Sequence, residues 1–270
     1  MYEKFYGLKE PPFSLTPDSR FLYMSQHHRE AMAALLYGVR ERKCFTLLTG
    51  EIGSGKTTLC RAVMNELEAS AAQVVLILDS FLNETELLEA VCDQLHIEPS
   101  ARTRRGLTDA LHHYLDEQHR LNRLVVVLID EAQNLSDGTL EQIRLLGNLE
   151  TEQAKLLQVV LVGQPELRST LQAPKLEQLD QRIAVRCHLR PLEPEEVEPY
   201  IYHRLRVAGL SAMVDFPQRT LKMIYEFTGG VPRKINLLCD RALLAGYVAS
   251  TRLIDEAIIR TAAMEAVSYT

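Results

Sequence analysis

The stretch 50-GEIGSGKT-57 matches the phosphate-binding pattern G-x-x-x-x-G-K-[ST] at every fixed position. An apolar run at 44–48 precedes it, and a segment with helical spacing at 58–67 follows it. This order predicts a strand, a glycine loop and a helix. Glycines let successive backbone N–H groups face inward, and the start of the helix adds positive potential, so the loop forms a nest for anions. The sequence therefore predicts a site for a nucleoside triphosphate.

Individual roles follow from the chemistry of this motif. Lys56 is expected to reach the β- and γ-phosphates, the Thr57 hydroxyl to ligate Mg²⁺, and Thr58 to support the α-phosphate side. The predicted site for ATP and Mg²⁺ comprises Glu51, Ile52, Gly53, Ser54, Gly55, Lys56, Thr57 and Thr58. The alternative is a glycine-rich surface turn beside an ordinary lysine, which the flanking strand and helix argue against.

Polar side chains follow two later apolar runs. Asp130 and Glu131 come directly after the run at 124–129, and Gln164 follows the run at 156–162. Asp130 would hold Mg²⁺, and Glu131 would polarise the attacking water as a general base. Gln164 would orient the water or touch the γ-phosphate. The alternatives are a solvated acidic pair at a strand end and an amide that bonds loop backbone.

The hydrophobic pattern alternates strands with helices over the first two thirds of the chain. Apolar runs at 44–48, 74–78, 124–129 and 156–162 predict buried strands, and helices are expected near 56–68, 84–95, 106–120 and 136–149. Asn83 and Ser136 are the predicted N-caps. Helices alone are expected after Pro191, near 195–207, 218–227, 233–249 and 255–266. The fold class is therefore α/β, a P-loop NTPase core with a parallel sheet between helices, followed by an all-helical subdomain.

We expect three parts along the chain. Residues 1–43 form an N-terminal linker and first helix packed on the core, 44–191 the nucleotide-binding core, and 192–270 a helical lid. Pro11, Pro12 and Pro17 predict that residues 2–20 run extended rather than helical.

Composition and net charge restrict the kinds of partner that the chain is expected to bind. The 270 residues are 46% hydrophobic and 24% charged, with a net charge of -6. That balance disfavours nucleic acid as a partner but leaves a local basic groove open. Arg102, Arg104 and Arg105 form the best basic patch, interpreted as a solvated face or else as a partner or polynucleotide contact. With no leader and no apolar run of bilayer length, the chain as given is expected in the cytoplasm.

The cysteines and histidines predict no metal centre. Five widely spaced cysteines indicate reduced core thiols, and the histidines lack a ligand spacing with them. The cysteines are Cys44, Cys60, Cys92, Cys187 and Cys239.

The loop 50-GEIGSGKTT, with 129-IDEAQ, 161-LVGQPEL, 180-DQRIAVRCHLRPL and 229-GGVPRKINLLCDRAL, resembles the AAA+ ATPases. The opening 2-YEKFYGLKEPPFSLTPDSRFLYMSQHHREAMAALLYGV and the GQPEL element resemble the ExeA (general secretion pathway A) family more narrowly. The resemblance implies that Gln164 takes the sensor 1 place and that Arg182 is an arginine finger, with Arg186 as competitor. It also implies that Arg233 is the sensor 2 arginine of the lid. For both arginines, surface ion pairs are the alternative.

The family resemblance places adenine between the N-terminal linker and the lid, near Phe21, Tyr23 and His28, where a core role is the alternative for the aromatic side chains. It further implies ATP hydrolysis between self-associated subunits, and work with an inner-membrane secretion partner at the inner face of that membrane. The chain is then either a cytoplasmic fragment or a stand-alone relative. Two alternatives stay open, an ATP-dependent DNA-binding regulator of the transposition-protein type and a nucleotide-stabilised scaffold.

Overall fold

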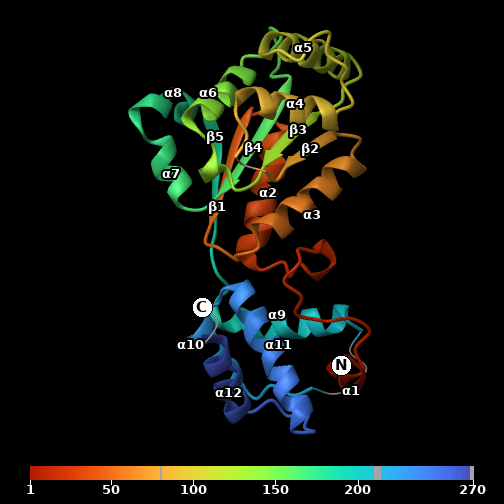
Figure 1. Cartoon of the computed structure of the whole chain (residues 1–270), viewed down its shortest axis with the longest axis vertical. Helices are drawn as coiled ribbons and strands as arrows, with labels where there is room; N and C mark the ends of the chain where they lie inside the picture. Colours follow the sequence, from red (N-terminus) through yellow and green to blue (C-terminus); the bar gives the residue numbers. More distant parts are fainter. Residues whose placement is uncertain (80, 210–213, 268–270) are drawn as a thin grey trace. The chain divides into compact units, whose positions relative to one another are not determined.

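A five-stranded parallel sheet forms the centre of one of two units in the computed structural model (Figure 1), which describes residues 1–79, 81–209 and 214–267. The α/β unit comprises Arg29–Ile52 and Leu59–Leu189. The helical unit comprises Met1–His28, Gly53–Thr58 and Arg190–Thr270. Residues Gly53–Thr58 of the glycine loop are therefore part of the helical unit, although β1, which precedes the loop, belongs to the sheet.

The sheet has the order β2-β3-β4-β1-β5, with every neighbouring pair parallel. The strands are β1 (Phe45–Gly50), β2 (Gln73–Ile77), β3 (Val125–Ile129), β4 (Leu157–Gly163) and β5 (Ile183–Leu189). Strands β1, β3 and β4 are buried along their whole lengths, as expected for a parallel sheet covered on both faces. The chain goes from β1 to the far edge at β2 and, after β4, crosses to β5 on the other side of β1. This topology puts the switch point at the carboxyl end of β1.

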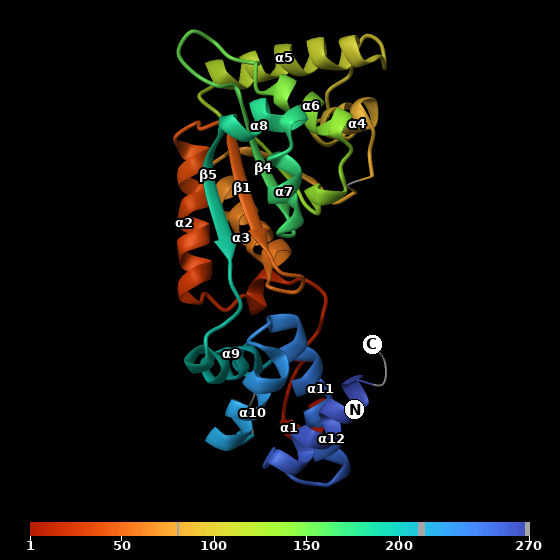
Figure 2. The ribbon, with the colours of Figure 1, turned by 90° about the vertical axis from the view of Figure 1, so that its left-hand side faces the viewer.

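Helices cover both faces of the sheet (Figures 1 and 2). One face packs its alternate side chains, such as Leu47 and Val127, with α4 (Glu84–Gln94), α5 (Arg104–Arg120) and α6 (Asp137–Leu146). On the other, a Cβ on Gly38 of α2 (Gln26–Arg40) would lie 2.4 Å from Thr46 Oγ1, so α2 packs tightly on β1. The unit is completed by α3 (Lys56–Ala69), α7 (Glu166–Leu171), α8 (Glu177–Arg182) and three-residue 3-10 turns at Ala132–Asn134 and Pro174–Leu176.

The predicted N-caps are confirmed. The Asn83 side chain accepts from the backbone of Thr85 and Glu86, and Glu86 bonds back to Asn83 N–H at 2.8 Å, which completes a capping box. Ser136 Oγ accepts from Thr139 N–H at 3.1 Å. The cysteines are free thiols in the described structure, and burial raises the pKa of Cys44 and Cys92 to about 11.

Strand β5 is an element that the sequence pattern missed. It lies at the sheet edge and pairs only with β1 in the described sheet, and its exposed or half-buried central residues include Arg186 and His188. The polar residues Arg186 and His188 interrupt its sequence, IAVRCHL, so β5 shows no continuous apolar run.

The helical unit contains α9 (Pro194–Val207), α10 (Gln218–Thr228), α11 (Pro232–Val248) and α12 (Glu256–Val267). Its apolar core includes Ile201, Ile224, Leu243 and Ile259. Within the described ranges, no helix combines the length and apolarity that a bilayer crossing requires.

The N-terminal segment contains two short helical elements that the sequence pattern does not predict. Tyr2–Tyr6 is a short helix, α1, and Ser19–Phe21 is a 3-10 turn, so the segment is not extended throughout. Its side chains pack with the helical unit rather than with the sheet, because Tyr6 and Phe13 are fully buried in the same cluster as α9 and α11. Residues 1–28 thus group with the helical unit, and α2 groups with the α/β unit from Arg29 onward.

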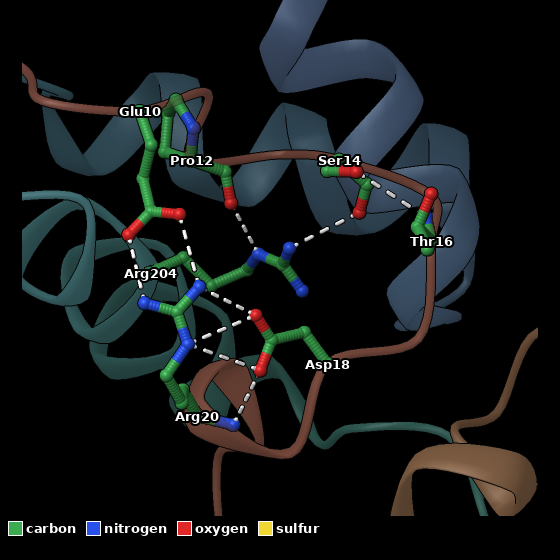
Figure 3. A network of polar contacts seen from close by, with 7 residues as sticks. All are labelled: Glu10, Pro12, Ser14, Thr16, Asp18, Arg20 and Arg204. Atoms are coloured by element: carbon green, nitrogen blue, oxygen red, sulfur yellow. Dashed lines mark hydrogen bonds and ion pairs between the residues drawn. The ribbon is translucent and has the colours of Figure 1, made fainter.

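One arginine of α9 fastens this segment (Figure 3). Arg204 is only 8% exposed and donates to the carbonyls of Pro12 at 2.6 Å and Ser14 at 3.1 Å. Its guanidinium carbon lies 4.9 Å from the ring centre of Phe21. Nearby, Arg20 is held by Glu10 and Asp18. We call residues 7–28 the strap.

Candidate nucleotide site

The glycine loop has the backbone that its motif predicts. Gly53 and Gly55 have φ angles of 80° and 101°, values that residues with a side chain rarely adopt. A Cβ on Gly53 would lie 2.5 Å from Arg233 Cβ, and one on Gly55 would lie 3.1 Å from His28 Nε2. Both glycines are therefore required by conformation and by the close approach of other residues.

The polar groups of the loop are withdrawn from solvent. Lys56, the first residue of α3, is 5% exposed, and Ser54 is fully buried. Within the described residues the Ser54 hydroxyl has no hydrogen-bond partner. Glu51 and Ile52 are exposed, and Thr57 and Thr58 are half-buried. A buried hydroxyl without a partner and a turn of positive-φ glycines fit a loop that holds a polar ligand.

The acidic pair lies at the carboxyl edge of the sheet. Asp130, directly after β3, is 3% exposed, and its Oδ1 accepts the N–H of Glu131 at 2.9 Å. Glu131 has a φ of 50°, a left-handed conformation that is strained for a residue with a side chain.

Two amides hold the Glu131 carboxylate. Glu131 Oε2 accepts from Gln133 Nε2 at 2.5 Å and from Gln164 Nε2 at 3.3 Å. Gln133 Oε1 in turn accepts the Gln164 backbone N–H at 3.0 Å. A Cβ on Gly163 would lie 2.7 Å from Gln133 Oε1, so a glycine at the end of β4 makes room for this amide. The structure thus joins the predicted Glu131 and Gln164.

Gln133 is a site residue that the sequence reasoning missed. It lies in the quoted segment 129-IDEAQ, two residues after Glu131, but no role was assigned to it. The sequence signal that could have found it is a neutral amide two residues after an acidic pair at the end of a strand. Only the tertiary structure shows that it bridges β3 to β4.

The two candidate finger arginines have different partners. Arg182, the last residue of α8, donates to Asn148 Oδ1 at 2.6 Å and to the Arg144 carbonyl at 3.4 Å, both neutral oxygens. Arg186 is in an ion pair with Asp180 at 3.0 Å and also donates to the carbonyl of that residue. Arg186 is therefore neutralised by its own subunit, whereas Arg182 is exposed and bonded to uncharged groups.

Arg233 belongs to the same unit as the glycine loop. It is the second residue of α11, and its backbone N–H donates to the Gly53 carbonyl at 3.1 Å. Its side chain is exposed. The residue predicted as sensor 2 thus touches the loop through its backbone.

The two aromatic candidates for the adenine region have packing roles. Phe21 is 5% exposed in the core of the helical unit, and the Tyr23 ring lies edge-on to Tyr200, with centroids 6.1 Å apart. His28 is different, because its buried ring contacts the glycine loop. The predicted arginine patch is partly paired, since Arg102 bonds Asp93 at 3.2 Å.

Comparison with known proteins agrees with the fold and the motifs. An AAA domain family model matches residues 39–171. The general secretion pathway protein A of Aeromonas hydrophila is 45% identical over 267 residues, which are 98% of this chain and 48% of that protein. The chain therefore spans about half the length of this curated relative.

Solved structures share the fold at low identity. Cdc6p from Pyrobaculum aerophilum has a TM-score of 0.72 and 19% identity, covering 94% of this chain and 70% of that one. The Aeropyrum pernix ORC2 protein has a TM-score of 0.71 and 19% identity, covering 95% and 71%. The RuvB Holliday junction branch migration motor of Thermotoga maritima has a TM-score of 0.59 and 18% identity, covering 88% and 68%.

The predicted α/β class, the parallel sheet between helices and the following helical part are confirmed. The chain belongs to the AAA+ ATPases, and within them it is a protein like general secretion pathway protein A, ExeA.

Proposed function

We propose that this chain binds Mg·ATP in the glycine loop and hydrolyses it with a water activated by Glu131. The observation that carries this proposal is the network at the sheet edge, in which Gln133 and Gln164 hold the Glu131 carboxylate directly after β3. The end of β1, from which the glycine loop leaves, lies on the same edge, because Thr49 is in register with Gly163. A general base at the sheet edge from which a phosphate-binding loop leaves suits phosphoanhydride hydrolysis.

The residues fit the proposed ligand. The buried, unpartnered Ser54 hydroxyl and the positive-φ glycines suit a phosphate chain held by backbone N–H groups and Lys56. Thr57 and Asp130 offer the hard oxygen atoms that Mg²⁺ prefers, and would hold it. Mg²⁺ supplies charge neutralisation at the phosphates when it is bound. Glu51, Ile52 and Thr58 complete the proposed loop site, and Gln164 would orient the water.

The roles of the two parts of the chain in nucleotide binding are also a proposal. We infer that residues 44–191 act as the nucleotide-binding core and that 192–270 act as a lid whose Arg233 senses the nucleotide. The bond between Arg233 N–H and the Gly53 carbonyl supports this role, because it ties the first turn of α11 to the loop. The Aeropyrum pernix ORC2 protein, with a similar fold, has been solved in ADPNP-ADP complexes.

Self-association completes the proposed site. Arg182, exposed and bonded to neutral oxygens, would reach the γ-phosphate held by a second copy of the chain. Fingers supplied in trans raise turnover about 10³- to 10⁵-fold in P-loop enzymes. Hydrolysis should therefore depend on assembly, and the cycle would drive assembly or remodelling of a partner.

The biological setting is proposed from the relative. The name general secretion pathway protein A suggests a secretion system of the type II kind, with an inner-membrane partner and a position at the cytoplasmic face of that membrane. Co-sedimentation with inner-membrane vesicles of a host that carries the secretion system tests this setting. Equal binding to vesicles from a host without the system would contradict it.

The DNA-binding regulator has less support. The arginine patch is its best feature, yet Arg102 lies beside Glu89 and Asp93, and Arg105 beside Asp109. These pairs reduce the positive potential that nonspecific DNA binding requires. Stimulation of ATP hydrolysis by duplex DNA at moderate salt would favour the regulator over the secretion role.

The test of hydrolysis is Glu131→Gln, which keeps the side-chain size but removes the base. Turnover should fall about 10²- to 10⁴-fold while ATP binding persists, because general bases contribute that much. Turnover is measured by phosphate release, and binding by calorimetry at equal protein concentration. Glu152→Gln, an exposed position in the loop before β4, is the matched control. Unchanged turnover in Glu131→Gln would contradict the assigned base.

A further inference from the structure

Two successive peptide groups of the glycine loop are held by their carbonyl oxygens. The Gly53 carbonyl accepts the backbone N–H of Arg233 at 3.1 Å. The Ser54 backbone is hydrogen-bonded by the ring of His28. His28, Arg233 and the loop residues Gly53–Thr58 all belong to the helical unit.

The tautomer of His28 follows from its surroundings. The ring is 3% exposed, and burial lowers its pKa to about 4, so it is neutral at pH 7. Nδ1 lies 2.7 Å from Ser25 Oγ, and that hydroxyl also accepts the His28 backbone N–H at 3.2 Å. The backbone bond to Ser54 needs a ring hydrogen on the nitrogen that faces the loop, Nε2, and in the neutral ring Nδ1 is then the acceptor, to which the Ser25 hydroxyl donates.

Nε2 faces the glycine loop, and we assign the Ser54 carbonyl as its partner. The bond to the Ser54 backbone raises the pKa of the imidazole, against the effect of burial, so the backbone group accepts a hydrogen. Nε2 also lies on this side of the loop, 3.1 Å from where a Cβ on Gly55 would stand. His28 thus donates to the loop one hydrogen bond that is directed by Ser25.

These two bonds orient the N–H groups that follow. In a planar trans peptide the carbonyl and the next N–H point in opposite directions. Holding the Gly53 and Ser54 carbonyls outward therefore turns the N–H groups of Ser54 and Gly55 to the other side of the loop. In a phosphate-binding loop those N–H groups are the donors that cradle the anion.

We propose that His28 is a positioning residue for phosphate binding, that Ser25 sets its tautomer, and that the strap delivers both to the loop. The inference rests on the proposed nucleotide site and deepens it. The strap is held on α9, where Glu196 accepts the Gln26 N–H at 3.0 Å and Arg204 bonds the carbonyls of Pro12 and Ser14 (Figure 3). Since α9 fastens the strap, the phosphate cradle is preorganised by the helical unit.

The test compares His28→Leu, which removes the donor, with His28→Gln, whose amide N–H can replace Nε2–H. The dissociation constant of Mg·ADP is measured by calorimetry on the full chain, together with kcat and KM for ATP. His28→Leu should weaken ADP binding about tenfold and raise KM by a similar factor, with kcat within about twofold. His28→Gln should recover most of the affinity, and Ser25→Ala should lose about threefold. His113→Leu, an exposed position on α5, is the control.

The outcomes separate the inference from the proposed function. If wild-type protein binds ADP and His28→Leu binds it equally well, the inference is overturned. The same holds if His28→Gln is as weak as His28→Leu, because the donor then has no role. If His28→Leu fails to fold, the other two variants still test the inference. His28→Gln should bind Mg·ADP nearly as tightly as the wild type, and Ser25→Ala should bind it more weakly. A wild-type chain that binds no ADP would overturn the nucleotide site itself, and the inference with it.

Discussion

At the scale of single residues, the buried imidazole of His28 makes folding depend on pH. Its pKa is about 4 in the folded chain, against an ordinary value of 6.5, because burial disfavours the charged ring. Between these two values the unfolded chain binds more protons than the folded one. The free energy of unfolding therefore falls as the pH falls through this window, and this contribution is fully retained above it.

We expect His28 to remove about 2 kcal/mol of stability between pH 7 and pH 5. Urea unfolding of the wild type and of His28→Gln at both pH values measures this contribution, because glutamine does not titrate. The loss on acidification should be smaller in the variant by about that amount. Equal losses in the two proteins would show that the His28 ring is not buried in its neutral form.

Other single residues show what local sequence can and cannot reveal. Lys56 and Asp130 are buried at the places that the motif and the apolar run predict. Gln133 bonds Gln164, which is 31 residues away in the chain. The His28 ring bonds the backbone of Ser54, which is 26 residues away. No local pattern encodes such pairings, since they depend on which strands and segments become neighbours.

At the scale of elements, the turn that leads into α11 depends on a glycine. Gly230 has a φ of 72°, and a Cβ there would lie 2.0 Å from the Leu192 carbonyl oxygen. The Leu192 N–H also donates to the Gly230 carbonyl at 2.9 Å. This close approach of backbone to backbone joins the start of the helical segment after β5 to the turn before α11.

Gly230→Ala should destabilise the helical unit strongly, by more than about 3 kcal/mol, because strain at positive φ adds to a backbone clash. Gly229→Ala is the matched control. Its φ is also positive, at 59°, but nothing lies within 4 Å of its Cβ position, so a loss of about 1 kcal/mol is expected. Urea denaturation followed by circular dichroism compares the two. Similar losses would mean that the backbone moves away from Leu192 at little cost.

The elements found from sequence and those missed differ in their burial. Three of the four apolar runs became the central strands β1, β3 and β4, which are buried along their whole lengths, and the fourth became the edge strand β2, which keeps the apolar sequence QVVLI although it is only partly buried. Strand β5 and the six-residue helices α7 and α8 were not predicted. Polar residues interrupt β5, and helices of less than two turns carry too few buried residues for a periodic signal.

At the scale of the whole molecule, the trans role of Arg182 is tested by mixing variants. Arg182→Ala keeps the proposed base but lacks the finger, and Glu131→Gln keeps the finger but lacks the base. Each alone should have turnover reduced about 10³-fold, and their mixture should regain a measurable fraction of wild-type activity because complete sites form between unlike subunits. Phosphate release across mixing ratios measures this recovery.

Arg186→Ala is the comparison in that experiment. Because Arg186 is paired with Asp180 in its own subunit, its loss should reduce turnover less than the loss of Arg182. If no mixing ratio restores activity, or if Arg186→Ala is the more severe variant, Arg182 is not the finger. Activity of the wild type that is independent of protein concentration would argue against a shared site altogether.

The sequence by itself determined the glycine loop, the acidic pair, the central strands and the family, because each depends on residues that are adjacent or periodic in the chain. Steric limits at Gly53 and Gly55 and continuous apolar runs operate locally, so they can be read without the fold.

Only the tertiary structure decided the strand order, the packing of the strap with the helical unit, the amide pair that holds Glu131 and the contact of His28 with the loop. These arrangements join residues far apart in sequence. They form where burial of apolar side chains and pairing of buried polar groups are satisfied together, and that condition belongs to the whole fold.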